Sequence, residues 1–179
     1  MYKTIIPLML LASAACANAE DVPITGTVES KCSVFTEVDG VYGSPQPYKL
    51  STTPADGGQL PVIRFDTSQA GYYIAKITTP TSFSSSPPLP DSVTWTGSTT
   101  VATVSDTNMN GYQAAKVTYN STTEYSLTVA GSVWITASST ATYGVDTSFP
   151  AGTYTAIITA ECIATVSYTH LTLPTIYSV

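Results

Sequence analysis

Two segments of this chain alternate strictly between residue types, and this alternation is the strongest constraint on its fold. In residues 22–34, every second position is small or apolar: Val22, Ile24, Gly26, Val28, Ser30, Cys32 and Val34. In residues 153–162, the corresponding positions are Tyr154, Ala156, Ile158, Ala160 and Cys162. Because successive side chains of a β-strand point to opposite faces, each segment is predicted to form a strand with one face toward a core.

Shorter alternating runs lie between these segments and are separated by turn signals such as Asp-Gly, Asn-Gly and Pro-Pro. We predict strands at Tyr48–Ser51, Leu60–Asp66, Gly71–Thr78, Ser92–Thr96, Thr99–Ser105, Gly111–Tyr119, Glu124–Ala130 and Ser132–Ser138. The chain is therefore predicted to be all-β, a single sandwich of about 8–10 short antiparallel strands over residues 20–164, with a barrel as the main alternative. The predicted core comprises Val93, Trp95, Tyr125, Leu127, Val129, Val133 and Ile135.

Serine and threonine, rather than charged residues, make the chain polar. The 179 residues include 31 Thr and 21 Ser, whereas only 10% are charged and 43% are apolar. The hydroxyl side chains fit the solvent faces of strands, where β-branched residues pack well. Twelve acidic against six basic side chains disfavour a nucleic-acid partner, which requires clustered Lys and Arg.

The first nineteen residues have the layout of a secretory signal peptide. Lys3 supplies a positive charge, residues 5–16 are largely apolar, and residues 17–19 (Ala-Asn-Ala) form a cleavage signal before Glu20. A lipoprotein anchor on Cys16 is the competing interpretation. No later segment is long and apolar enough to span a membrane. We therefore expect a secreted or periplasmic protein that reaches the cell surface and has no transmembrane segment.

Removal of this leader leaves two cysteines, Cys32 and Cys162. An even number of cysteines in an exported chain favours a disulfide. Both residues fall on predicted buried faces, as a bridge requires, because bridged Cβ atoms approach to about 4 Å. We predict that this disulfide joins the first strand to the last, with two unpaired thiols as the alternative. No metal site is expected at the pair, because no further Cys and no well-placed His could complete it.

Catalytic groups are scarce, so neither an enzyme activity nor a cofactor is expected. The one histidine, His170, lies close to the C-terminus. Without it, no His is present to act as the base for a Ser or Cys nucleophile. Paired carboxylates could serve glycoside hydrolysis if two came within about 5–10 Å of each other. The candidate acids on turns are Asp39, Asp56, Asp66, Asp91, Asp106 and Asp146. Solvated turn residues are the plain interpretation of this set.

The stretch 106–111 resembles the start of a calcium loop. Asp106, Asn108 and Asn110 offer oxygen ligands at alternate positions before a glycine that permits a sharp turn. The pattern then fails at Val117, where a bidentate Glu is required. The plain interpretation is a hairpin, since Asn110-Gly111 favours the positive φ angles of a tight turn. A weak calcium site is the alternative.

Two further motifs have plain interpretations. Asn120-Ser121-Thr122 matches an N-glycosylation sequon and is interpreted as a loop. The tyrosine pairs at positions 42 and 48 and at positions 72 and 73 are candidates for stacking on sugar rings. Because adjacent strand residues point to opposite faces, one of Tyr72 and Tyr73 is expected in the core.

At its two ends the predicted domain resembles the immunoglobulin-like subunits of bacterial fimbriae and pili. The matching residues are Ile24-Thr25-Gly26-Thr27-Val28, Cys32-Ser33-Val34 and Phe149-Pro150-Ala151-Gly152-Thr153-Tyr154. In fimbrial subunits, a similar Gly-hydrophobic-Cys segment opens the domain and a similar Pro-x-Gly-x-Tyr turn introduces the last strand. The partner cysteine of those subunits usually lies earlier in the chain than Cys162. The resemblance implies an immunoglobulin-like β-sandwich.

The resemblance also implies assembly by strand exchange, with a periplasmic chaperone and an outer-membrane usher as partners. An added strand satisfies an open sheet edge and fills a hydrophobic groove. Val22, Ile24 and Val28 would form the donor strand, within the twelve residues from Glu20 to Lys31 that precede the first cysteine of the domain. We therefore predict a noncatalytic structural or adhesive subunit of a bacterial surface appendage or extracellular matrix, which associates with itself or with related pilus subunits by β-strand pairing. A soluble periplasmic or secreted binding module for carbohydrate or calcium is the alternative.

The last fifteen residues carry a separate resemblance. Residues 165–179 read TVSYTHLTLPTIYSV, which is similar to a translated sequencing-adapter string found at the ends of reading frames on assembled contigs. We expect this tail to be non-native, with one further strand as the alternative. His170 lies within it.

Overall fold

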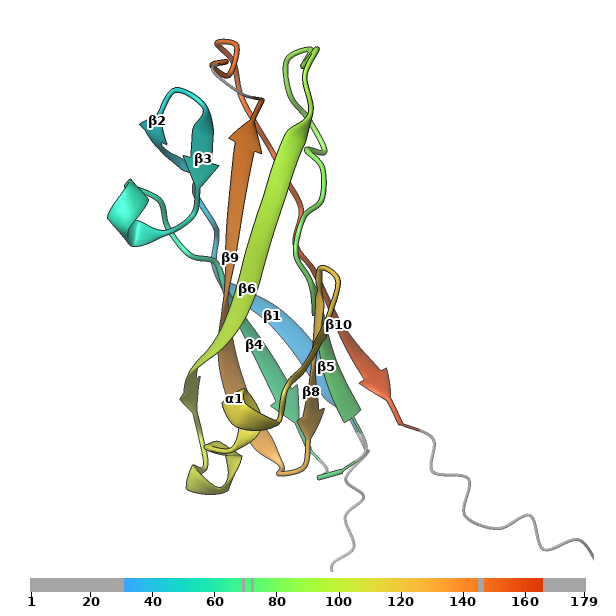
Figure 1. Ribbon diagram of the computed structural model, residues 1–179. Coiled ribbons are helices and arrows are strands. Elements are labelled where there is room, and N and C mark those ends of the chain that lie inside the picture. Colours follow the sequence, from blue (N-terminus) through green and yellow to red (C-terminus); the bar gives the residue numbers. More distant parts are fainter. Residues whose placement is uncertain (1–30, 69, 72, 145–146, 166–179) are drawn as a thin grey trace, which may run out of the picture.

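The computed structural model describes residues 31–68, 70–71, 73–144 and 147–165, which form two antiparallel β-sheets around one hydrophobic core (Figure 1). The predicted all-β class is confirmed, and the two separate sheets make a sandwich rather than a barrel. The predicted leader over residues 1–19 and the donor residues Val22, Ile24 and Val28 lie outside the described residues. So does the predicted tail, apart from Thr165.

The larger sheet is built around one long strand, β9. It consists of β1 (Cys32–Val38), β2 (Gly43–Gln46), β3 (Lys49–Ser51), β4 (Val62–Thr67), β6 (Val93–Val104) and β9 (Gly131–Tyr143). Along one edge β9 pairs with β6, and along the other it pairs first with β4 and then with β3. β1 pairs with β4 and β2 pairs with β3, so β1 and β2 are the outer strands on that side.

The smaller sheet has four strands in the order β10 (Thr159–Ala164), β5 (Tyr73–Thr78), β8 (Thr122–Leu127) and β7 (Val117–Tyr119). β7 and β8 form a hairpin whose turn consists of Asn120 and Ser121. Asn120 has a φ angle of 51°, a left-handed conformation that asparagine tolerates better than most residues. The sequon interpreted as a loop therefore begins in this hairpin turn.

Among the residues that the structure describes, helical structure is limited to short segments. They are η1 (Pro54–Asp56), η2 (Thr107–Met109) and α1 (Tyr112–Ala115). In the part of the chain that the structure describes, no helix has the length and apolar character needed to cross a membrane.

The core lies between the sheets and is filled by alternate residues of the central strands. The buried strand residues are Ile63, Phe65, Ala75, Ile77, Tyr125, Leu127, Val133, Ile135 and Ala137. Four predicted core residues, Tyr125, Leu127, Val133 and Ile135, are confirmed. The other three, Val93, Trp95 and Val129, are only partly buried. Val93 and Trp95 lie at the start of β6, an edge strand, and Val129 lies just beyond the end of β8.

The predicted disulfide is confirmed. Cys32 and Cys162 are bonded across a sequence separation of 130, with their Cα atoms 6.1 Å apart. The bond joins the start of β1 in the larger sheet to β10 in the smaller sheet. It is therefore a covalent link between the two layers of the sandwich.

Two predicted strands, Ser92–Thr96 and Thr99–Ser105, form one continuous strand, β6. The predicted break at Gly97 and Ser98 is wrong, because pairing with β9 continues through both residues. Gly97 is required by packing instead of by a turn: a Cβ atom there would lie 2.8 Å from the Cβ of Thr79.

The predicted strand Gly111–Tyr119 and the hairpin turn at Asn110-Gly111 are also wrong. Asn110 has a φ angle of −58° and Gly111 one of −77°, both right-handed, and the chain enters α1. Only the last three residues, Val117–Tyr119, form a strand. Packing explains the difference, because Met109 and Tyr112 are buried in the core. The Tyr112 hydroxyl also accepts the backbone N–H of Val129 at 2.9 Å.

A cluster of aromatic side chains fills one end of the molecule. The aromatic cluster consists of Tyr42, Phe83, Trp95, Tyr143, Phe149 and Tyr154. The ring of Phe83 lies 4.7 Å from that of Trp95 and 5.1 Å from that of Tyr154. The Tyr154 hydroxyl donates to the carbonyl oxygen of Pro150 at 2.6 Å. The Pro-x-Gly-x-Tyr turn thus anchors the chain before β10, which begins at Thr159, later than the alternation predicted.

Candidate functional site

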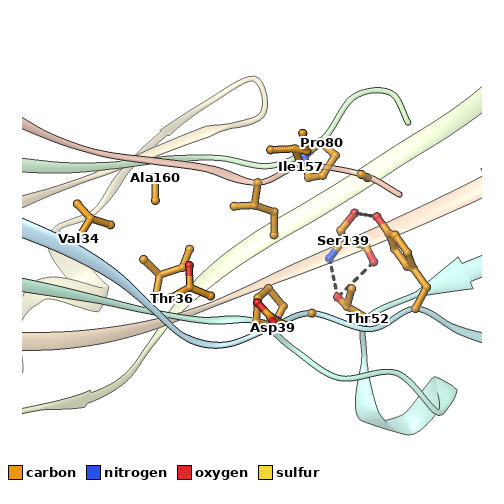
Figure 2. A pocket seen from close by; sticks show the side chains of 14 residues that line it. Val34, Thr36, Asp39, Thr52, Pro80, Ser139, Ile157 and Ala160 are labelled. Atoms are coloured by element: carbon orange, nitrogen blue, oxygen red, sulfur yellow. Dashed lines mark hydrogen bonds between the residues drawn. The ribbon is translucent and has the colours of Figure 1, made fainter. Parts of the chain in front are cut away.

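One side of the sandwich is open, between the first strand, β1, and the last strand, β10. A cavity of about 500 Å³ occupies this side, and Figure 2 shows its walls. One wall is formed by Val34, Thr36, Asp39 and Gly40, and the other by Ala156, Ile157, Ile158 and Ala160. Ile63 and Pro61 also line the cavity. We call this feature the groove.

The strands that flank the groove are less buried than the central strands. Neither β1 nor β10 contains a fully buried residue, whereas the central strands β4, β5, β8 and β9 each do. Val34, Ile158 and Ala160 pack against the core but remain partly exposed, and Ile157 is 64% exposed. The groove is therefore lined by apolar side chains that are in contact with both the core and solvent.

One end of the groove is polar. The hydroxyl oxygens of Tyr42 and Ser139 lie 2.8 Å apart and share a hydrogen bond. The backbone N–H of Ser139 donates to Thr52 Oγ1 at 2.9 Å, and Figure 2 shows Ser139 and Thr52 side by side. Burial raises the pKa of the Tyr42 phenol, and the hydrogen bond with Ser139 opposes that rise. Asp39 carries the one charge among the side chains that line the cavity.

The groove continues past this polar end. A second cavity of about 400 Å³ shares Gly40, Tyr42 and Ala156 with the first. Its wall follows the chain back from Ala156 to Gly152. The two cavities together extend along residues 152–160, which is the irregular segment before β10 and the first two residues of β10.

The edges of the two sheets differ in how they are covered. Among the described strands, none pairs with the side of β10 that faces away from β5, or with the side of β1 that faces away from β4. On the free edge of β6, in contrast, two backbone groups are bonded by side chains of the α1 segment. The backbone N–H of Val101 donates to Gln113 Oε1 at 2.9 Å, and Lys116 Nζ donates to the carbonyl oxygen of Thr99 at 2.5 Å.

The residues of the candidate calcium loop form a capped turn. Asp106 Oδ1 accepts the backbone N–H of Asn108 at 2.8 Å and the Asn108 side-chain amide at 2.9 Å. Asn110 is the C-cap of η2. A cation would compete with two N–H donors for the same carboxylate oxygen. Within the described residues, no three His, Cys, Asp or Glu side chains gather as a metal site would require.

Two of the candidate acids, Asp56 and Asp66, lie in ion pairs. Asp66 belongs to β4 instead of a turn, and it pairs with Arg64, which also pairs with Glu37. Asp56 lies in η1, 2.8 Å from Lys49 Nζ. The hydrogen bond from that lysine is the main cause of the lowered pKa of Asp56. Asp146 lies outside the described residues.

The two tyrosines of the first candidate pair have different surroundings. Tyr42 belongs to the groove and the aromatic cluster, whereas Tyr48 is 41% exposed and lies in neither. Tyr73 is partly buried against the core, and Tyr72 lies outside the described residues. The three tyrosines that the structure describes, Tyr42, Tyr48 and Tyr73, therefore do not form one aromatic platform.

Several groove residues are absent from the sequence-based site predictions. Thr36, Thr52 and Ser139 come from distant parts of the chain, and their meeting with Tyr42, which was a candidate for sugar stacking, depends on strand pairing. One feature of the sequence could have indicated this site. Ser139 is a polar residue among the alternate, inward-facing apolar positions of β9, between Ala137 and Ala141. A polar residue at a core position requires a hydrogen-bond partner, and Tyr42 is that partner.

Comparison of the chain with protein-family models, curated proteins and solved structures finds no match.

Proposed function

We propose that this protein is an exported, noncatalytic structural or adhesive subunit of a bacterial surface appendage or extracellular matrix, and that it assembles by β-strand pairing. In this proposal, a strand from another subunit occupies the groove between β1 and β10. One observation carries it: the two strands beside the groove expose unpaired edges and partly buried apolar residues, while each central strand contains fully buried residues.

A β-strand suits this groove better than a small molecule does. Its backbone can pair with the free strand edges, and its alternate side chains can point into the cavity. Val34, Ile158 and Ala160 would contact those inward side chains, which replaces their contact with water by packing. Burial of apolar surface then stabilises the assembly by about 25 cal/mol per Å².

The chain contains a segment with the required alternation. Shortly before β1, small or aliphatic residues stand at alternate positions, so in a strand they would share one face: Val22, Ile24, Gly26 and Val28. They would present three aliphatic side chains and one glycine to the groove of another subunit. An unfilled groove of this kind promotes uncontrolled pairing. We therefore include in the proposal a periplasmic chaperone that shields it and an outer-membrane usher, as in the pilus subunits that the sequence resembles.

The test uses two complementary variants of the chain without its leader. Ile24→Asp places a charge in the donor segment, which prevents its insertion, and leaves the groove unchanged. Ala160→Trp fills the groove with a large side chain and leaves the donor segment unchanged. The parent protein is expected to form oligomers or fibres, measured by light scattering with size exclusion and by electron microscopy. Each variant alone is expected to be monomeric. Mixed together, they are expected to form a heterodimer that does not grow further.

Controls separate assembly from folding. Ile163→Asp places a charge on the outward face of the same strand, where Ile163 is 40% exposed, and should assemble like the parent protein. Ile158→Trp is a second blocked groove, and circular dichroism shows whether each variant is folded. A parent protein that stays monomeric, and that loses only stability when residues 20–28 are deleted, would contradict the proposal. Retention on a glycan column by the monomer would favour a binding module instead.

A further inference from the structure

We infer that the Cys32–Cys162 disulfide closes one end of the groove and thereby sets how far an inserted strand can reach and in which register it binds. The inserted strand is residues 22–30 of a second copy. This inference rests on the proposed function, and it assigns a role in partner recognition to a bond that otherwise serves stability.

The distance across the disulfide excludes an intervening strand. Neighbouring strands lie about 4.8 Å apart, so two strands with a third between them are separated by roughly 9.5 Å. The Cα atoms of Cys32 and Cys162 are only 6.1 Å apart. β1 and β10 are therefore direct neighbours at this point, and no strand can lie between them there.

Beyond the disulfide the two walls separate. The cavity begins at Val34 and Ala160, two residues from the respective cysteines, and continues to Gly152 through the second cavity. The open part thus spans residues 152–160 along one wall. An extended strand of the same number of residues covers roughly 27 Å. The alternating segment 22–30 has this length. The side chains on its inward face can therefore fill the open part of the groove without the segment passing the disulfide.

The chain's own N-terminal segment is badly placed to fill its own groove. The backbone N–H of Lys31 donates to Ser68 Oγ at 2.8 Å, and the backbone N–H of Ser68 donates to the Lys31 carbonyl oxygen at 3.0 Å. These bonds continue the pairing of β1 with β4 up to Lys31, at the closed end of the groove. Residues before Lys31 would have to reverse direction there and pass the disulfide. A second copy can insert the same segment from the open end.

Insertion from the open end also sets the direction of the strand. The folded domain of the donor follows its residue 31, so that end of the segment stays outside the groove. The free end, near Val22, then lies deepest, beside Val34 and Ala160. This direction is parallel to β1 and antiparallel to β10, because β1 runs away from the disulfide and β10 runs toward it.

The experiment maps the depth of insertion in the heterodimer described above. The donor is the Ala160→Trp chain with the photoreactive residue benzoylphenylalanine in place of Val22. The acceptor is the Ile24→Asp chain, either with its disulfide or with both cysteines replaced by alanine. After irradiation, mass spectrometry identifies the residues that are crosslinked in the acceptor. A second donor with the photoreactive residue at Val28 locates the outer end of the strand.

With the disulfide intact, crosslinks from position 22 are expected near Val34 and Ala160, and those from position 28 near Gly152–Ala156. Without the disulfide, crosslinks from position 22 are expected to move toward residues 31–33 and 162–164. Crosslinks beyond Cys162 in the disulfide-bonded acceptor, or at Gly152–Ala156 from position 22, would overturn the inference and leave strand pairing intact. A heterodimer that does not form would overturn the proposed function and this inference together. If the alanine variant does not fold, the positions of the crosslinks in the disulfide-bonded acceptor test the inference on their own.

Discussion

Lys116 reaches from the segment after β6 back to that strand and donates a hydrogen bond from Nζ to the carbonyl oxygen of Thr99 at 2.5 Å. Gln113 accepts the backbone N–H of Val101 on the same edge. Together they occupy backbone groups that would otherwise be free to pair with another chain. Uncovered edges are sites of aggregation, and lysine is a common means of protecting them. The fold therefore covers the edge of β6 at Thr99 and Val101 and leaves the groove between β1 and β10 open.

Removal of this cover should redirect association. We expect the double variant Gln113→Ala, Lys116→Met to form irregular aggregates, because the Val101 N–H and Thr99 carbonyl groups become free to pair with other chains. Thioflavin fluorescence and light scattering during incubation measure this. Lys31→Met, which removes an exposed positive charge away from this edge, is the matched control. Equal behaviour of the two variants would show that the edge contacts of α1 do not limit association.

The covering of β6 could not be predicted from the sequence. The alternation of apolar and polar residues predicts strands because it reflects local geometry, and β9 follows it from Val133 to Tyr143. The segment 111–119 was predicted as a strand, yet its first half is helical because Met109 and Tyr112 pack into the core. Such packing depends on residues distant in the sequence, which a local pattern does not contain.

The disulfide should contribute strongly to stability. The bond closes a loop with a sequence separation of 130, for which loop entropy gives an upper value of about 5 kcal/mol. We expect the double variant Cys32→Ala, Cys162→Ala to lose about 2–5 kcal/mol in free energy of unfolding, measured by urea denaturation. Reduction of the parent protein should give a similar loss and serves as the control. A change below about 0.5 kcal/mol would mean that the unfolded chain is not restricted by the bond.

Tyr125 should make the protein sensitive to alkali. Burial raises the pKa of its phenol, whose hydroxyl lies 2.7 Å from Thr99 Oγ1. Above pH about 10 the unfolded chain loses a proton that the native state retains, so stability falls as the pH rises toward the native pKa. Tyr125→Phe should cost about 1 kcal/mol at neutral pH and less at alkaline pH. Urea denaturation at both pH values checks this, with exposed Tyr48→Phe as the control. A constant difference between the two proteins would contradict the prediction.

The aromatic cluster should stabilise the end of the molecule opposite the disulfide. Phe83 contacts four other rings of the cluster, so Phe83→Ala should cost about 2–4 kcal/mol in free energy of unfolding. Phe35 is 43% exposed and stacks with Arg64, so Phe35→Ala should cost about 1 kcal/mol or less. Thermal denaturation of both variants provides the comparison, and equal losses would show that the cluster adds nothing beyond ordinary surface contact.

The groove was only partly foreseeable. The two cysteines on matching parities predicted that the first and last strands lie side by side, which is where the groove is found. The pattern could not show that these strands meet at Cys32 and Cys162 and separate beyond Val34 and Ala160. That separation follows from the strand order and from the irregular course of residues 152–158. Neither can be predicted from a local alternation of residue types.

The polar end of the groove offers a direct measurement of a buried hydrogen bond. Ser139→Ala removes the hydroxyl that lies 2.8 Å from the Tyr42 hydroxyl, while its backbone bonds with Thr52 remain. We expect a loss of about 1 kcal/mol in free energy of unfolding. The pKa of Tyr42 should rise further, because the bond with Ser139 opposes the effect of burial. Ultraviolet titration of tyrosine and a double-mutant cycle with Tyr42→Phe measure both effects. The double variant should lose less than the sum of the single variants, since either change alone breaks the same bond. Strictly additive losses would show that the two hydroxyls do not interact.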